Sequence, residues 1–286
     1  MADNRNPYIS KSGRPSLRYS VVAFLDILGY KQMILKANEQ NSSQEFLNNL
    51  HRILVRAVNH LRDPLGENNK VFKSSVLDND LHKVVTFTDN IVIAYPIIDT
   101  VKDAEWELGQ IFSQISGYQL TLAKAGFFVR GAIAIGDVYI DDYVVYGQGL
   151  VDAYITESSR ARDPRVVLTD AAHEATKIHL KDYADPSRAP QVRQFFRDTD
   201  GQLFVNYLER TMIAEDELGP DFESIIEHKQ AVERKLKDYT GEPELWSKFA
   251  WVANYHNYFC DLFTYFTDEH KIDMSNFQMR PSLLYE

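Results

Sequence analysis

The stretch that decides the fold is VVAFLDILGY, residues 21–30. Its first seven residues are apolar except for one carboxylate, Asp26. A short continuous apolar run of this kind is typical of a buried β-strand, and Gly29 allows the chain to turn after it. A carboxylate in such a strand is costly unless it is paired or binds a metal ion. Asp26 is therefore the first candidate functional residue.

A second carboxylate, Asp89, lies between two short β-branched runs, HKVVTF and IVIAYP. Two such runs around Thr88-Asp89-Asn90 predict a hairpin with Asp89 near its tip. If a helix separates the first strand from this hairpin, the two elements are neighbours in the sheet, and Asp26 and Asp89 meet at one end. A divalent cation such as Mg²⁺ or Mn²⁺ would remove their mutual repulsion. The alternative is that Asp26 caps the following helix and Asp89 is an ordinary turn residue.

The remaining pattern of the first half predicts the order β-α-β-β-α-β, which is that of a ferredoxin-like fold. Apolar residues recur at helical spacing over residues 31–61, with an interruption at 41–43, and again over 103–124. Residues 127–140 predict a long strand, with Gly131 and Gly136 as a bend and a turn. We therefore expect an α+β protein with a ferredoxin-like core.

The second half predicts additions to this core. Residues 139–215 should extend the sheet with further hairpins, and the chain from residue 221 onward is helical in pattern, with a break at 241–243. We divide the chain into a flexible N-terminal arm (1–18), a catalytic domain (19–215) and a C-terminal helical extension packed on the core (216–286).

Composition limits the functions that the chain can have. It has 286 residues, of which 44% are hydrophobic, so a sizeable core is possible. The net charge of −10, without a cluster of Lys and Arg, argues against nucleic-acid binding. A single cysteine, Cys260, excludes a disulfide framework, and its aromatic surroundings predict a buried thiol. No signal-peptide region and no apolar run of membrane-spanning length is present, which predicts a cytoplasmic protein that does not enter a membrane.

The segments FLDILGY, TFTDNIVIAY, VRGAIAIGDV and YGQGLVDAY together resemble the class III nucleotidyl cyclase catalytic domain, over about residues 20–170. The resemblance implies a site for two Mn²⁺ or Mg²⁺ ions on a nucleoside triphosphate. The residues that it assigns are Asp26 and Asp89 as metal-binding carboxylates, Ile27 through its backbone carbonyl, and Leu28, Gly29 and Tyr30 through backbone amides to the triphosphate.

Three positions depart from the adenylyl cyclase pattern. Val85 stands where those enzymes place a Lys that reads the purine. The helix after the Gly-rich turn lacks the Asn-x-x-x-Arg pair that acts on the transition state, because Asp152 and Thr156 occupy its places. Arg130 or Arg160 would have to supply the missing charge. For Arg130 the other interpretation is a structural salt bridge.

The uncharged Val85 and the C-terminal stretch KFAWVANYHN (248–257) resemble the pyrimidine cyclases of bacterial Pycsar antiphage systems. This resemblance implies conversion of UTP, favoured over CTP, to the 3′,5′-cyclic monophosphate and pyrophosphate, as a second messenger in antiviral defence. It also implies a homodimer with sites at its interface and a separate effector that binds the cyclic nucleotide.

Two other functions remain open from the sequence. One is a catalytically degenerate cyclase-fold module that binds nucleotide or a partner. The other is a palm of the polymerase or diguanylate cyclase kind, although the hairpin reads Phe87-Thr88-Asp89-Asn90 and lacks a Gly-Gly-acidic-acidic-Phe run.

Overall fold

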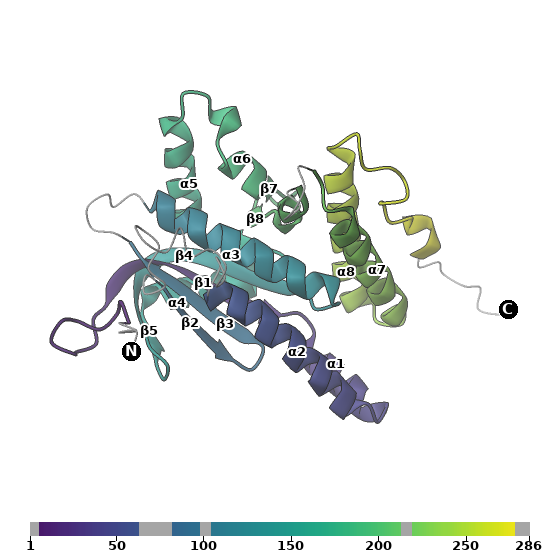
Figure 1. Ribbon diagram of the computed structural model, residues 1–286, viewed down its shortest axis with the longest axis horizontal. Coiled ribbons are helices and arrows are strands. Elements are labelled where there is room, and N and C mark those ends of the chain that lie inside the picture. Colours follow the sequence, from purple (N-terminus) through teal and green to yellow (C-terminus); the bar gives the residue numbers. More distant parts are fainter. Residues whose placement is uncertain (1–5, 63–81, 98–103, 213–218, 278–286) are drawn as a thin grey trace.

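A computed structural model of the chain describes residues 6–62, 82–97, 104–212 and 219–277 (Figure 1). Its centre is a mixed sheet with the strand order β2-β3-β1-β4-β6-β8-β7, in which β5 pairs with β4. The strands are β1 (Arg18–Ile27), β2 (Lys83–Phe87), β3 (Asn90–Pro96), β4 (Val129–Ile140), β5 (Val145–Tyr146), β6 (Val166–Leu168), β7 (Phe195–Arg197) and β8 (Leu203–Val205). All neighbouring strands are antiparallel except β4 and β6, which are parallel.

Helices cover both faces of this sheet. The longer ones are α1 (Tyr30–Glu39), α2 (Ser43–Arg62), α3 (Glu105–Lys124), α4 (Gln148–Arg160), α5 (Asp170–Asp182), α7 (Phe222–Asp238) and α8 (Pro243–Asp261), with short helices α6 (Gln191–Gln194) and η3 (Tyr207–Met212) between them. In Figure 1, α2 and α3 run side by side across one face. The side chains of β1 point alternately to the two faces of the sheet. Val21 and Leu25 pack under α2 and α3 on one face, whereas Phe24 packs edge-on against Tyr154 of α4 on the other.

The sequence prediction of an α+β protein with a βαββαβ ferredoxin-like order is confirmed. β1, α1 with α2, the β2–β3 hairpin, α3 and β4 follow one another as expected. β1 lies between β3 and β4, so Asp26 is paired in register with Asn90 on one side and Arg130 on the other. This placement of β1 brings the candidate residues to one end of the sheet.

The two glycines expected to bend and turn the long strand lie inside β4 instead. Both serve close packing. A Cβ at Gly131 would lie 2.5 Å from the carbonyl oxygen of Phe24 on the neighbouring strand. A Cβ at Gly136 would lie 3.0 Å from the backbone of Gly149, so the missing side chain lets α4 approach the sheet.

The expectation of further hairpins after residue 139 is only partly right. The β4–β5 and β7–β8 hairpins are present, but α5 separates the second of them from β6. Thr169 begins α5 by accepting a hydrogen bond from the Ala172 amide. β6 runs parallel to β4, and a parallel pair needs a crossover, which α4 supplies.

The described part of the segment expected to form a flexible arm, residues 6–18, packs against the sheet. Tyr8 is fully buried, and its hydroxyl donates to Ser20 Oγ over 3.0 Å. The Asn6 amide donates to the Ile140 carbonyl over 2.9 Å, and β1 begins at Arg18. The segment is held to the α4 side of the sheet because an aromatic ring within its polar sequence fills a cavity there.

The C-terminal helices α7 and α8 share a hydrophobic cluster with the sheet. From the core side it contains Phe128, Ala132, Val167 and Phe204, and from the extension Ile225, Val232, Phe249 and Val252. Cys260 is buried in this cluster, as expected. The domain boundary expected between residues 215 and 216 lies outside the described residues. Within the described part of the chain, no helix is long and apolar enough to span a membrane.

Candidate functional site

Asp26 and Asp89 lie at the same end of the sheet. Asp26 is the penultimate residue of β1 and is in register with Asn90, the first residue of β3. Asp89 directly precedes Asn90 in the tight turn between β2 and β3, where Thr88 adopts a left-handed conformation with φ of 56°. The negative charge of Asp89 is close enough to raise the pKa of Asp26.

The Asp26 side chain is only 16% exposed and contacts the guanidinium of Arg130. Burial raises the pKa of this carboxyl to about 6, and the nearby charges of Asp89 and Glu157 add to the effect. The hydrogen bond from Arg130 Nε, 2.9 Å long, opposes the shift. Asp26 is thus mostly ionised at pH 7, but a proton competes for it within reach of neutral pH.

Glu157 is a third acidic residue of this site, and the sequence analysis missed it. It lies on α4 with only 3% of its side chain exposed, and its Oε1 is 2.8 Å from Arg130 Nε. The resemblance to the cyclases assigns roles on this helix only to the positions of the absent Asn-x-x-x-Arg pair, Asp152 and Thr156. The helical spacing of the sequence was the available signal that Glu157 faces the core. Glu157 follows Ala153 by one helical turn, and both of these residues and Thr156 are buried.

Arg130 therefore makes the salt bridge that was one of its two expected roles, and it also remains available for a ligand. Its Nε is shared between Asp26 and Glu157. The hydrogen bond that Arg130 makes to a described residue comes from Nε, not from its two terminal nitrogens, and 30% of the side chain is exposed. The end of the guanidinium group that faces the solvent can thus bind an anion.

The residues at this end of the sheet fit a hard divalent cation. Leu28 N–H donates to the carbonyl of Phe128, the residue before β4, and successive residues of a central antiparallel strand bond to opposite neighbours, so the Ile27 carbonyl is directed toward β3 and its hairpin. Asp26, Asp89 and the Ile27 carbonyl at this end offer oxygen atoms only, which suits Mg²⁺ or Mn²⁺, and Asp89 also lines a separate cavity beside α2. The described residues contain no group of three or more His, Cys, Asp or Glu that could hold a metal. A metal here would need ligands from phosphate or water.

The turn from β1 into α1 has free donors, although fewer than expected. The Leu28 amide is already bonded to Phe128 O at 2.8 Å, so its expected role toward a triphosphate is not available in this structure. Gly29 adopts a left-handed conformation (φ 73°) and precedes the helix, and its carbonyl accepts from Met33 N. The amides of the first helical turn, beginning with Tyr30, have no acceptor within the helix and can bind an anion.

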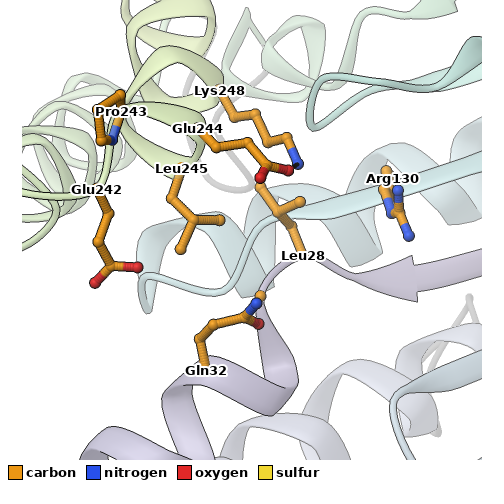
Figure 2. Close-up of a pocket in the computed structure, with 9 residues that line it drawn as sticks. Leu28, Gln32, Arg130, Glu242, Pro243, Glu244, Leu245 and Lys248 are labelled. Carbon is orange, nitrogen blue, oxygen red and sulfur yellow. Dashed lines mark hydrogen bonds and ion pairs between the residues drawn. The ribbon is translucent and has the colours of Figure 1, made fainter.

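A cavity of about 510 Å³ opens beside this turn (Figure 2). Its walls come from three parts of the chain that are distant in sequence. They are Leu28, Gly29 and Gln32 at the start of α1, Arg130 on β4, and Glu242, Pro243, Glu244, Leu245 and Lys248 at the start of α8. The contribution of α8 to this cavity was not predicted, because neither its helical spacing nor the resemblance of residues 248–257 indicates where the start of the helix packs.

Val85 and Arg160 are placed differently relative to this site. Val85 pairs with Val92 on β3 and packs into the cluster on the α4 side, which is the face that carries Asp26. Arg160 instead forms a bidentate salt bridge with Asp170 on α5, at 2.6 and 3.1 Å. The charge role considered for Arg160 is thus not supported, and Arg130 is the arginine at the site.

Comparison with known proteins gives only distant likenesses. No family profile matches the chain, and neither does any curated protein. A class III adenylyl cyclase-like ATP-binding protein from Pseudomonas aeruginosa is a structural neighbour with 11% identity and a TM-score of 0.38 over 56% of this chain. The catalytic core of a rhodopsin-guanylyl cyclase with converted specificity, in complex with ATPαS, is another, with 14% identity and a TM-score of 0.37 over 57% of this chain and 83% of that one. The chain spans 35% of the Pseudomonas protein. Likenesses this distant establish neither the family nor the activity.

Proposed function

We propose that the protein is a metal-dependent nucleotide cyclase, which converts a nucleoside triphosphate to a 3′,5′-cyclic monophosphate and pyrophosphate. The observation that carries the proposal is the pairing of Asp26 and Asp89 at one end of the sheet, close enough for the charge of one to raise the pKa of the other. Arg130 and the first turn of α1 supply positive charge and amide donors beside them. The arrangement is suited to a ligand with several phosphates.

The chain's own residues would position the reactants. The amides of the first turn of α1 and the terminal nitrogens of Arg130 would hold the phosphates, so that the ribose 3′-oxygen attacks the α-phosphorus in line. The new bond joins that oxygen to phosphorus, pyrophosphate leaves, and the hydroxyl proton passes to solvent. Metal ions held by Asp26, Asp89 and the Ile27 carbonyl would activate the hydroxyl and neutralise the triphosphate charge.

A pyrimidine substrate, UTP before CTP, is the finer part of the proposal. Val85 presents an apolar side chain on the same sheet face as Asp26, so it offers a base no charged or hydrogen-bonding partner. The proposal includes a homodimer with sites at its interface, and a cyclic nucleotide that acts in antiviral defence through a separate effector. These parts rest on the resemblance to the Pycsar cyclases.

A second candidate function is a nucleotide-binding module without catalysis. Two observations favour it: Arg130 is already paired with Asp26 and Glu157, and α4 has Asp152 and Thr156 where the family has its Asn and Arg. Binding without turnover would be the result of losing the charge that stabilises the transition state.

The test is incubation of the purified protein with ATP, GTP, CTP and UTP separately in the presence of Mn²⁺, followed by mass-spectrometric identification of the products. We expect cyclic UMP or cyclic CMP, and no cyclic product from the Asp26→Ala and Asp89→Ala variants. A failure of all four triphosphates would refute the enzyme proposal, and measured nucleotide binding in that case would support the second candidate. Near-normal turnover by either variant would refute the metal assignment.

A further inference from the structure

We infer that the C-terminal extension supplies one wall of the nucleotide site and that Lys248 of α8 binds the terminal phosphates of the triphosphate. The inference deepens the proposed function, since it takes a nucleoside triphosphate as the ligand. It concerns binding alone, so it is tested separately from turnover.

The position of Lys248 is the first part of the case. Lys248 lines the same cavity as Leu28 and Gly29 of the β1–α1 turn and Arg130 of β4. Its side chain is 19% exposed, so most of its length is fixed by packing. Figure 2 shows its amino group extended from α8 across the Leu28 side chain, on the side of the cavity where Arg130 lies. Two cationic side chains, Lys248 and Arg130, thus line a cavity whose volume is within the usual range of small-molecule sites.

The electrostatics of the cavity are the second part. The N-termini of two helices, α1 and α8, open onto it. Helix N-termini carry the positive ends of the helix dipoles and favour anions. Arg130 and Lys248 add two cationic side chains. The acidic residues of the cavity, Glu242 and Glu244, both lie in the first turn or cap of α8. The cavity therefore favours negative charge, and in the ligand-free protein the carboxylates of Glu242 and Glu244 supply it.

Two carboxylates neutralise Lys248 in the absence of a ligand: Glu244 on α8, and Asp163, whose raised pKa is opposed by the charge of Lys248. Lys248 Nζ lies 3.3 Å from Glu244 Oε1, one helical turn earlier, and the Glu244 side chain is 89% exposed. Ion pairs of this exposed i,i+4 kind contribute little to stability. A phosphate oxygen placed between Lys248 and Arg130 would make stronger charge-assisted hydrogen bonds. We expect the triphosphate to displace the Glu244 carboxylate from Lys248.

The order of the elements predicts which phosphates Lys248 contacts. Asp26 and Asp89 lie at the end of the sheet, where the reacting α-phosphate would be, and the Leu28–Gly29 turn lies between them and α8. Lys248 then acts on the end of the phosphate chain farther from the reaction. Its removal should weaken binding of triphosphates and leave binding of monophosphates unchanged.

The experiment is isothermal titration calorimetry with Mg²⁺ and three probes: 3′-deoxyuridine triphosphate, which has no 3′-hydroxyl and cannot cyclise, 3′-deoxyuridine monophosphate and inorganic triphosphate. Loss of a charged hydrogen bond costs about 1.5–3 kcal/mol, which corresponds to a tenfold or greater loss of affinity. We expect the Lys248→Ala variant to bind both triphosphate probes at least about tenfold more weakly than the wild type. Lys248→Arg should retain most of the affinity, and Glu244→Gln should bind them as tightly or more tightly.

Lys177 of α5 is the control, because it also pairs with a glutamate one helical turn earlier, Glu174 at 3.0 Å, and does not line the cavity. Lys177→Ala should bind all probes as the wild type does, and unchanged melting temperatures would show that the variants are folded. Wild-type affinity for the triphosphates in Lys248→Ala overturns the inference, even if cyclic product is formed. A loss of triphosphate affinity without any cyclic product from the wild type supports the inference while the cyclase proposal fails.

Discussion

Asp26 combines two properties that rarely serve stability: it is largely buried, and the charge of Asp89 lies nearby. Arg130 offsets part of the cost, but the pKa of Asp26 is still raised to about 6. A purely structural partner for Arg130 already exists in Glu157, which is more deeply buried. A carboxylate retained at a net cost is typical of a residue that binds a ligand.

The Asp26→Asn substitution should therefore stabilise the ligand-free protein at pH 8. The pKa of Asp26 is raised from 3.8 to about 6 in the folded protein, so the folded state binds the proton more tightly than the unfolded state does. The contribution of this carboxyl to the free energy of unfolding therefore decreases as pH rises from about 4 through 6. The gain in the variant should be on the order of 1–3 kcal/mol above pH 6 and should vanish below pH 4. Thermal melting over this pH range measures it, with the exposed Asp137→Asn of β4 as control. A lower melting temperature for Asp26→Asn at pH 8 would contradict this account.

At the scale of elements, the sequence was sufficient for the strands and helices whose pattern is local. The buried run of β1, the two-residue turn before β3 and the helical spacing of α3, α7 and α8 were all found. Gly131 and Gly136 were misinterpreted as a bend and a turn, since they allow close packing against Phe24 and Gly149, partners remote in sequence. The site was predictable as far as Asp26, Asp89 and Arg130. Glu157 and Lys248 were not, because their role depends on where α4 and α8 pack.

Arg165 joins three of these elements. This fully buried residue precedes β6, forms ion pairs with Asp198 and Asp200 of the β7–β8 turn, and lies 5.8 Å from the Trp251 ring centroid on α8. Trp251 Nε1 in turn donates to Asp198 Oδ2 over 2.8 Å. The Arg165 guanidinium thus fixes α8, and with it the α8 wall of the cavity, to the sheet.

Arg165→Met should lower the free energy of unfolding by about 3–5 kcal/mol, because it leaves the poorly exposed Asp198 without its cation. Urea denaturation measures the loss. The double substitution Arg165→Met with Asp198→Asn should recover part of it, since the uncompensated charge is then gone. If the single variant is as stable as the wild type, the network does not hold the elements together.

For the whole molecule, the junction of core and extension contains a buried chain of hydrogen bonds. Tyr207 of η3, His228 of α7 and His256 of α8 are linked at 2.8 and 2.9 Å, and His256 Nε2 contacts the His270 carbonyl at 2.7 Å. That carbonyl only accepts, so His256 carries its proton on Nε2, His228 donates from Nδ1, and the Tyr207 hydroxyl donates to His228 Nε2. Each ring is neutral, and a second proton on His256 Nδ1 would face the N–H of His228.

This arrangement should make the protein less stable in acid. Burial lowers the pKa of His256 to about 4, and it also lowers the pKa of His228. The positive charge of Lys229 further disfavours protonation of His256, whose ring lies beside the Cys260 thiol. The unfolded chain binds protons near pH 6.5, so stability falls as pH decreases from 6.5 toward 4, by about 2 kcal/mol at pH 5 from His256 alone. Melting temperatures at pH 7.5 and 5.0 should differ less in His256→Asn than in the wild type or in the exposed His51→Asn. An equal difference in all three proteins would exclude this source of acid sensitivity.

The walls of the cavity come from residues 28–32, from Arg130 and from residues 242–248. During synthesis on the ribosome, the first two are available long before α8 leaves the exit tunnel. A nascent chain that has folded its sheet still lacks the last wall of its pocket. Nucleotide binding through Lys248 would therefore begin only once α8 has been synthesised and has packed on the sheet, and a message truncated before α8 would yield a chain that holds the two aspartates but cannot close the site around a triphosphate.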